Sequence, residues 1–297
     1  MAASRSQPQS VIPFEARFSS GSSPVYFRGS EENIFTSSEP LLTYFHALFA
    51  AYGPQHWWPG RTRFEVIVGA ILTQNTSWTN VERAIANLRR ARLLSPAAVF
   101  RASSPKLSAL LRPSGYFRQK TKTLKSFVQF LYRDHGGSLT RLFATPTPVL
   151  REQLLSLRGI GPETADSILL YAGKHPVFVI DAYTRRILER HGLAQPKARY
   201  QELRQLFEFA LPLDHHLFNE FHALIVHTGK HFCRKQTPIC STCPLRQFLQ
   251  SDAPLFPMAL EKPSAPAHVA CEVACDVAPE VAPGPAAAGR RSMVASS

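Results

Sequence analysis

Asp181 is the residue of this sequence whose type and setting best fit a catalytic role. It follows an apolar run and precedes a helical pattern in the stretch LRGIGPETADSILLYAGKHPVFVIDAYTRR, residues 157–186. Aspartate is a preferred helix N-cap, where backbone N–H groups and the helix dipole keep its carboxylate ionised. Such a fixed negative charge is what a transition state with a positive sugar carbon requires. The alternative interpretation is a capping residue without a chemical role.

A loop with two glycines precedes Asp181 and could bind an anion. Gly159 and Gly161 can adopt backbone angles closed to other residues, and they keep side chains away from the loop. Pro162 suits the first turn of the next helix, where its missing N–H costs nothing. A tight turn that leads into a helix N-terminus is a binding site for phosphate, so this loop could grip DNA and hold a sugar against Asp181. An ordinary turn between two helices would have the same pattern.

The composition favours a partner with many negative charges. The 297 residues include 34 Lys and Arg but 21 Asp and Glu, which gives a formal net charge of +13. Basic side chains that neutralise phosphates release counterions, so a nucleic acid is a natural partner. No apolar run approaches the ~20 residues of a membrane-spanning helix, and the N-terminal stretch lacks the apolar core of a signal peptide. We expect a cytoplasmic protein that meets no membrane and is nucleoid-associated if bacterial.

Helical periodicity fills the middle of the chain and must position these residues. Apolar spacing predicts helices at 41–53, 64–74, 78–94, 120–136, 148–157, 162–173, 181–192, 200–211 and 216–233. The segment PVFVI (176–180) could pass for a strand, but it is short and lacks a partner. We therefore predict an all-α fold. Residues 1–37 are rich in Ser, Pro and Gly and residues 251–297 in Ala and Pro, so we expect both to be disordered.

Several motifs, in the order in which they occur, resemble the helix-hairpin-helix DNA glycosylases of the endonuclease III superfamily. They are ILTQNTSWTNVERAI (71–85), PSGYFRQKTKTL (113–124), GIGPETA (159–165), IDAYTRR (180–186) and a C-terminal cysteine motif. Each motif alone is ambiguous, but their order and spacing make the resemblance specific. It covers roughly residues 41–249.

The resemblance implies two helical domains. Residues 61–178 would form a helical barrel domain with the hairpin at about 154–173, and residues 38–60 plus 179–250 would form the second domain. Double-stranded DNA would bind across the cleft between them, with a damaged base flipped into a pocket. We expect the protein to act as a monomer.

The resemblance also implies roles for single residues. Asp181 matches the family's catalytic aspartate, and Gln74 matches the residue that fills the gap left by the flipped base. Four hairpin residues match the DNA contacts: Gly159, Ile160, Gly161 and Thr164. Lys120 lies in a basic run with Arg118 and Lys122 and could contact phosphate, although a solvated helix face is the alternative.

Glu163 stands where lyase members of this family have a lysine. A glutamate cannot form a Schiff base with the sugar, so the lysine-dependent route is closed. The resemblance therefore implies a monofunctional DNA N-glycosylase, which cuts the N-glycosidic bond with water and has no AP-lyase activity.

Trp57 and Trp58 suggest which base is removed. The segment from 51 to 78 is most similar to the endonuclease III related branch, which resembles 3-methyladenine DNA glycosylases. Alkylated purines are cationic, and aromatic faces attract cations. The two tryptophans could equally be core residues. The alternatives to an alkylpurine glycosylase are an enzyme for oxidised or mismatched pyrimidines and a non-catalytic DNA-binding protein of the same fold, although a pure binder has no need of Asp181.

The cysteine motif resembles an iron–sulfur loop but is incomplete. Cys233, Cys240 and Cys243 have the family's spacing, whereas Leu249 occupies the place of the fourth cysteine. A [4Fe–4S] cluster normally takes four thiolates. The open alternatives are a substitute ligand from His227, His231 or a tail cysteine, a zinc ion bound with a histidine, and an empty loop held by packing.

Overall fold

The computed structural model describes residues 39–55, 57, 60–249 and 254. The segment 1–37 and nearly all of 251–297, which we predict to be disordered, lie outside these residues. The helices of the first half are α1 (Glu39–Tyr52), α2 (Arg63–Leu72), α3 (Trp78–Arg90), α4 (Pro96–Arg101), α5 (Ser104–Leu110), η2 (Arg112–Ser114), α6 (Phe117–His135) and α7 (Leu139–Phe143). Those that follow are α8 (Thr147–Leu155), α9 (Pro162–Ser167), η3 (Ile168–Gly173), α10 (Ala182–Arg190), α11 (Tyr200–Ala210), α12 (His215–His231), η4 (Cys240–Thr242) and η5 (Arg246–Phe248).

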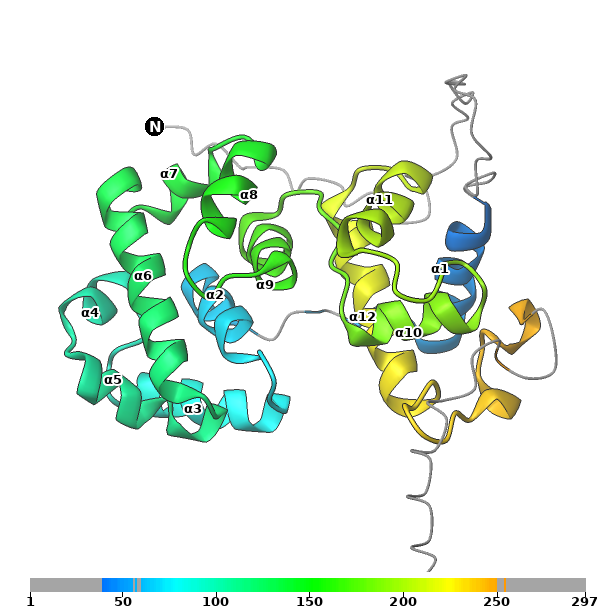
Figure 1. The fold of residues 1–297 in the computed structure, drawn as a ribbon, viewed down its shortest axis with the longest axis horizontal. Coiled ribbons are helices and arrows are strands. Elements are labelled where there is room, and N and C mark those ends of the chain that lie inside the picture. Colours follow the sequence, from blue (N-terminus) through cyan, green and yellow to red (C-terminus); the bar gives the residue numbers. More distant parts are fainter. Residues whose placement is uncertain (1–38, 56, 58–59, 250–253, 255–297) are drawn as a thin grey trace, which may run out of the picture. The chain divides into compact units, whose positions relative to one another are not determined.

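The described residues contain no strand, so the all-α prediction is confirmed (Figure 1). The segment 176–180 is extended but forms no sheet. In the same described part of the chain, no helix is both long and apolar enough to cross a bilayer.

A first core lies among α2 to α9. Helix α2 is its centre, because its residues from Phe64 to Leu72 are all buried. A helix that is apolar on every side is stable only when other helices surround it. Helices α3, α6 and α9 pack against α2, and Figure 1 shows them grouped around it. This arrangement fixes the end of α2, where Gln74 follows.

A second core lies among α1, α10, α11 and α12. Its aromatic centre is Phe178, whose ring stacks on Phe207 with 3.7 Å between centroids and meets Phe218 and Phe221 edge to face. Aromatic pairs in these geometries contribute beyond the area that they bury. The described residues fall into one compact unit, so the division into two domains stays a prediction.

Helix α12 approaches α10 closely because one of its residues is a glycine. A Cβ atom added to Gly229 would lie 2.4 Å from the ring of Tyr183 on α10. His222 lies seven residues earlier on α12 and therefore on the same face. The close approach brings His222 near the start of α10, where Asp181 lies.

The segment from α9 through η3 connects the two cores. Ile168 and Leu169 are buried in the first core, whereas Leu170 is buried in the second and Tyr171 packs against both. The η3 turn is a π-helix, a form that is rare and often found at functional sites. Glu163 and Tyr171 are thus on one continuous helical segment that both cores hold in place.

A buried ion pair joins the two helices of the hairpin. Arg151 on α8 donates to both carboxylate oxygens of Asp166 on α9, at 2.7 and 3.1 Å, and the Asp166 side chain is fully buried. Removing one partner of such a pair typically costs about 3–5 kcal/mol, because a buried charge is left unpaired. The pair therefore keeps the hairpin angle fixed.

Candidate active site and nucleic-acid interface

The two hairpin glycines have different structural roles. Gly159 has φ +87°, and a Cβ atom there would lie 2.2 Å from Oγ1 of Thr123 on α6. Gly161 has φ −93°, and no atom lies within 4 Å of its added Cβ. The expectation that both glycines use special backbone angles is wrong for Gly161. Its missing side chain instead leaves open space in front of the N-terminus of α9.

The side chains of Ile160 and Thr164 face inward. Ile160 is 4% exposed and belongs to the first core, and its N–H donates to the carbonyl of Leu157 at 3.1 Å. The Ile160 side chain therefore anchors the hairpin, and the contact of this loop residue with DNA stays a prediction. Thr164 is also buried, and its hydroxyl oxygen accepts a hydrogen bond from Gln74.

Gln74 brings three of the predicted DNA-contacting residues together. It follows the end of α2, and its Nε2 donates to the carbonyl oxygen of Gly159 and to Oγ1 of Thr164, each at 2.9 Å. The next residue, Asn75, has a left-handed backbone with φ +52°. The turn after α2 is thus fastened to the hairpin.

Lys120 does not face solvent, and its predicted phosphate contact is wrong. The residue is 3% exposed, and its Nζ donates to the carbonyl oxygens of Leu72 at 2.9 Å and Ser114 at 2.6 Å. Burial lowers the pKa of its ammonium group. Lys120 therefore ties the end of α2 to the turn before α6, while its neighbours Arg118 and Lys122 are exposed.

Tyr116 is an exposed aromatic residue that none of the predicted site roles includes. It is 66% exposed, has φ +43° and immediately precedes α6. The hydrogen bond from Lys120 to Ser114 holds this turn near the end of α2. Exposed aromatic rings can stack on bases. The sequence signal was the aromatic residue after the Pro-Ser-Gly turn.

Asp181 is the N-cap of α10, as its sequence setting predicts. Its Oδ1 accepts hydrogen bonds from the backbone N–H of Thr184 at 2.7 Å and from the Thr184 hydroxyl at 2.9 Å. Its Oδ2 lies 3.8 Å from Nε2 of His222, and the side chain is 15% exposed. The helix N-terminus stabilises the negative charge, and one oxygen remains for a substrate.

Glu163 and Asp181 interact electrostatically. Glu163 lies in the first turn of α9. Although the Glu163 residue is exposed, its partial removal from water and the negative charge of Asp181 together raise the pKa of its carboxyl to about 7. The two acids are therefore near enough for their charges to interact.

Trp57 is connected to the same site through Tyr171. Trp57 lies close enough to Tyr171 to act on its hydroxyl, and that hydroxyl lies 2.6 Å from Nδ1 of His222. Lys230 places its ammonium 5.5 Å from the centroid of the Trp57 ring. Trp58, the other predicted pocket residue, lies outside the described residues. No sequence motif pointed to Tyr171 or His222.

Comparison with known proteins identifies the family. Residues 68–212 match the family described as HhH-GPD superfamily base excision DNA repair protein. A protein of Methanocaldococcus jannaschii named as a DNA repair glycosylase is 45% identical over 222 residues, which cover 74% of this chain and 99% of that protein. The chain belongs to the HhH-GPD superfamily of base excision DNA repair proteins.

Other HhH-GPD relatives agree with this assignment. Endonuclease III of Thermotoga maritima is 28% identical over 183 residues, 62% of this chain and 80% of the relative. H. pylori 3-methyladenine DNA glycosylase bound to 1,N6-ethenoadenine superposes with a TM-score of 0.58 and 30% identity over 66% of this chain and 98% of that one. A non-covalent endonuclease III–DNA complex shares the fold, with a TM-score of 0.63, 18% identity and coverage of 72% and 96%. The resemblance seen in the sequence is confirmed, and DNA is the partner of this HhH-GPD protein.

The HhH-GPD cysteine loop is held by arginines. Arg190 donates to Sγ of Cys233 at 3.2 Å and to the carbonyl oxygens of Arg234 and Lys235 at 2.8 and 3.1 Å. Arg186 donates to the carbonyl of Cys233 at 2.7 Å. Burial raises the pKa of the Cys243 thiol to about 11.

The loop does not offer the donors of a four-thiolate cluster. Its three cysteines and Leu249 line a cavity of about 10 Å³, which is the room of a single water. The histidine that lines this cavity is His191, whose Nδ1 contacts the Tyr44 hydroxyl, whereas His227 and His231 do not line it. Among the described residues, no group of three or more His, Cys, Asp or Glu is arranged to hold a metal ion. The tail cysteines lie outside the described residues.

Proposed function

We propose that this HhH-GPD protein is a monofunctional DNA glycosylase that hydrolyses the N-glycosidic bond of alkylated purines such as 3-methyladenine in double-stranded DNA. The observation that carries the proposal is the pair formed by Asp181 and Glu163. The carboxylate of Asp181, held as a helix cap, is available to a reacting sugar. Glu163 occupies the hairpin position where a lyase needs an amine, and its charge interacts with that of Asp181. The 30% identical 3-methyladenine DNA glycosylase supports the choice of base.

The hairpin binds and orients the DNA strand. The open space at Gly161 allows a phosphate to approach the N-terminus of α9, where helix amides and the dipole favour an anion. Exposed Arg118 and Lys122 on α6 add positive charge nearby, because Thr123 on the same helix lies against Gly159. The sugar beyond that phosphate then comes toward Asp181.

Asp181 stabilises the positive sugar as the glycosidic bond breaks. The electron pair of the C1′–N bond stays with the base, and the carboxylate of Asp181 interacts with the oxocarbenium-like carbon. Water then adds to C1′, and its proton passes to the carboxylate. Because Oδ1 is occupied by Thr184, Oδ2 is the oxygen that faces the sugar.

A cationic base suits this site because its departure needs little acid catalysis. An alkylated purine leaves as a neutral molecule once the bond electrons return to its ring. Trp57 already attracts one cation, the ammonium of Lys230, so its ring is accessible to positive charge. Glu163 cannot form an imine with the opened sugar, and the reaction therefore stops at the abasic site.

One experiment tests the activity and the base together. The purified protein is incubated with laboratory-methylated DNA and with duplexes that contain one ethenoadenine, one oxidised pyrimidine or one mismatched thymine, and the released bases are identified. Release of 3-methyladenine, with strand breaks only after alkali, supports the proposal. Release of pyrimidines alone would identify the other glycosylase class, and no release from any substrate would identify a non-catalytic binder.

The Asp181→Asn variant separates binding from chemistry in the same assay. We expect it to bind the damaged duplex and release no base, because the amide carries no negative charge. Borohydride treatment of the wild-type reaction should trap no covalent protein–DNA adduct. A trapped adduct would contradict the monofunctional reaction, whereas wild-type rates from Asp181→Asn would contradict the catalytic assignment.

A further inference from the structure

His222 approaches the carboxylate oxygen of Asp181 that the helix cap does not use. Its Nε2 lies 3.8 Å from Oδ2 of Asp181, while Oδ1 accepts both hydrogen bonds from Thr184. His222 is 5% exposed, and its Nε2 has no hydrogen-bond partner in the described residues. A buried N–H group without a partner is rare, so its position beside a catalytic oxygen calls for a role.

Tyr171 determines which nitrogen of His222 carries the proton. The Tyr171 hydroxyl lies 2.6 Å from Nδ1 of His222. The Asp181 carboxylate faces Nε2 of His222 and can only accept, so the proton of a neutral imidazole is favoured on Nε2. Nδ1 is then an acceptor, so the Tyr171 hydroxyl donates to it and holds this tautomer.

The charges around His222 agree with a neutral ring. Burial lowers the pKa of His222. The negative charge of Asp181 raises this pKa, but by less than burial lowers it. Burial and the charges of Asp181 and Glu163 raise the pKa of Tyr171 well above its usual value, so the phenol keeps its proton. The ring of Phe178 packs edge to face on the imidazole and adds no charge.

We propose that His222 is a positioning residue: Tyr171 fixes its tautomer, and its Nε2–H aims Oδ2 of Asp181 at the deoxyribose. The inference rests on the proposed glycosylase function. A hydrogen bond forms when the 3.8 Å separation shortens by about 0.8 Å, a shift typical of catalytic contacts that tighten on substrate binding. Polar contacts then run from Tyr171 through His222 to Asp181 and the reacting sugar, and Trp57 of the proposed base pocket lies at the Tyr171 end.

The test uses four variants of the full chain. His222→Phe removes the N–H donor and keeps a ring, whereas His222→Gln keeps an N–H near the same place. Tyr171→Phe removes the proton that fixes the tautomer. Tyr44→Phe is the matched control, because the Tyr44 hydroxyl makes the same kind of buried contact with Nδ1 of His191, at 3.0 Å, away from Asp181.

We expect the single-turnover rate of 3-methyladenine release to fall about 10- to 100-fold in His222→Phe and Tyr171→Phe, with the dissociation constant for damaged DNA unchanged. His222→Gln should recover most of the rate, and Tyr44→Phe should keep the wild-type rate. Because Tyr171 acts through His222, the Tyr171→Phe/His222→Phe double variant should be no slower than His222→Phe alone. Wild-type rates in His222→Phe, or losses that add fully in the double variant, would overturn the proposal.

Nitrogen NMR of the histidine-labelled protein supplies a readout that does not depend on activity. The proposal requires the His222 signals of a neutral ring with its proton on Nε2, and a changed tautomer in Tyr171→Phe. A proton on Nδ1, or a charged ring at neutral pH, would overturn it. If the wild-type protein releases no base from any duplex, the proposed function fails, and the NMR result still decides the tautomer.

Discussion

The side chain of Gln74 reaches across from the end of α2 and donates a hydrogen bond to the carbonyl oxygen of Gly159 at 2.9 Å. The same nitrogen donates to the hydroxyl of Thr164. The residue expected to fill the space of the flipped base is therefore fastened to the loop expected to hold the phosphate. Insertion of Gln74 into DNA and gripping of the strand would be coupled through these two contacts.

Gln74→Ala should weaken binding to a damaged duplex about tenfold, because two hydrogen bonds of roughly 0.5–1.5 kcal/mol each no longer join the turn to the hairpin. Fluorescence anisotropy with a labelled duplex measures the affinity. Gln129→Ala, which removes an exposed glutamine later on α6, is the control. Equal affinities for the two variants would contradict the coupling.

Alanine at each hairpin glycine should have a different effect. Gly159→Ala should lower the free energy of unfolding by about 2–4 kcal/mol, because the residue has φ +87° and its Cβ would meet Thr123. Gly161→Ala should fold normally but bind DNA more weakly, since its Cβ enters the open space where we propose that a phosphate binds. Denaturant unfolding and DNA titration separate the two. A stable Gly159→Ala protein would show that the turn geometry is wrong.

The two lysines at the start of α6 should behave as a contrasting pair. Lys120→Met leaves two backbone carbonyls without their partner, so we expect a loss of about 1–3 kcal/mol in stability and the same salt dependence of DNA binding. Lys122→Ala should keep stability and reduce the slope of log affinity against log salt by about 1. A lower salt slope in Lys120→Met with unchanged stability would instead support a phosphate contact by Lys120.

The sequence predicted the parts of the site that depend on local patterns. Asp181 was recognised because an acid before a helical period is a cap, and the structure places it at the start of α10. The long helices were expected close to their observed bounds. The short helices α4, α5 and α7 were not, because five to seven residues carry too little of the helical period to be recognised.

The parts that the sequence could not predict depend on tertiary packing. Lys120 lies in a basic run, which is a pattern typical of the protein surface. It is buried because the end of α2 and the turn before α6 both approach its side chain. The sequence places Ile160 in a loop that could bind phosphate. The burial of its side chain depends on packing in the first core, which no local pattern shows. Tyr171 and His222 lie 51 residues apart, so no local spacing could join them.

The cysteine loop should be stabilised by Arg190 more than by metal. Arg190→Met should lower the melting temperature, because a sulfur and two carbonyls lose their donor, whereas Cys240→Ser should leave it nearly unchanged. Protein purified without oxygen should contain far less iron than a [4Fe–4S] cluster needs. A brown protein with four irons per chain, bleached and destabilised by a chelator, would contradict this prediction.

Glu163 should make the stability of the protein depend on pH. The pKa of its carboxyl is about 7 in the folded protein against 4.5 for the ordinary group, so between these values the folded state binds more protons than the unfolded state. The contribution of Glu163 to the free energy of unfolding is therefore present below about pH 4.5 and is lost as the pH rises through 7. Glu163→Gln stays neutral at every pH, so its melting temperature should match the wild type in acid and exceed it at pH 8.

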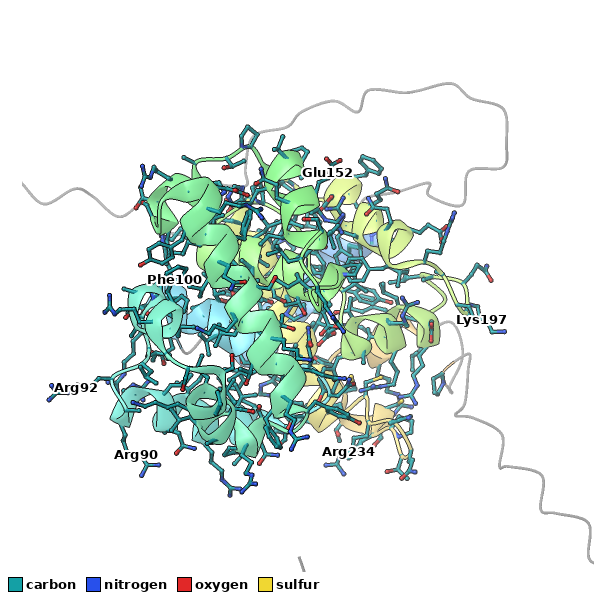
Figure 2. The ribbon with its side chains drawn as sticks, turned by 60° about the vertical axis from the view of Figure 1, so that its left-hand side comes forward. Arg90, Arg92, Phe100, Glu152, Lys197 and Arg234 are labelled. Carbon is teal, nitrogen blue, oxygen red and sulfur yellow. The ribbon has the colours of Figure 1, made fainter. Side chains whose placement is uncertain are left out.

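The control for this pH dependence is Glu152→Gln, which removes an acid that is exposed at the surface (Figure 2). Asp181→Asn supplies a second check, because the negative charge of Asp181 is one cause of the raised pKa. Its pH dependence should shift toward acid relative to the wild type. A constant difference in melting temperature between Glu163→Gln and the wild type from pH 5 to 8 would show that Glu163 does not have the raised pKa expected beside Asp181.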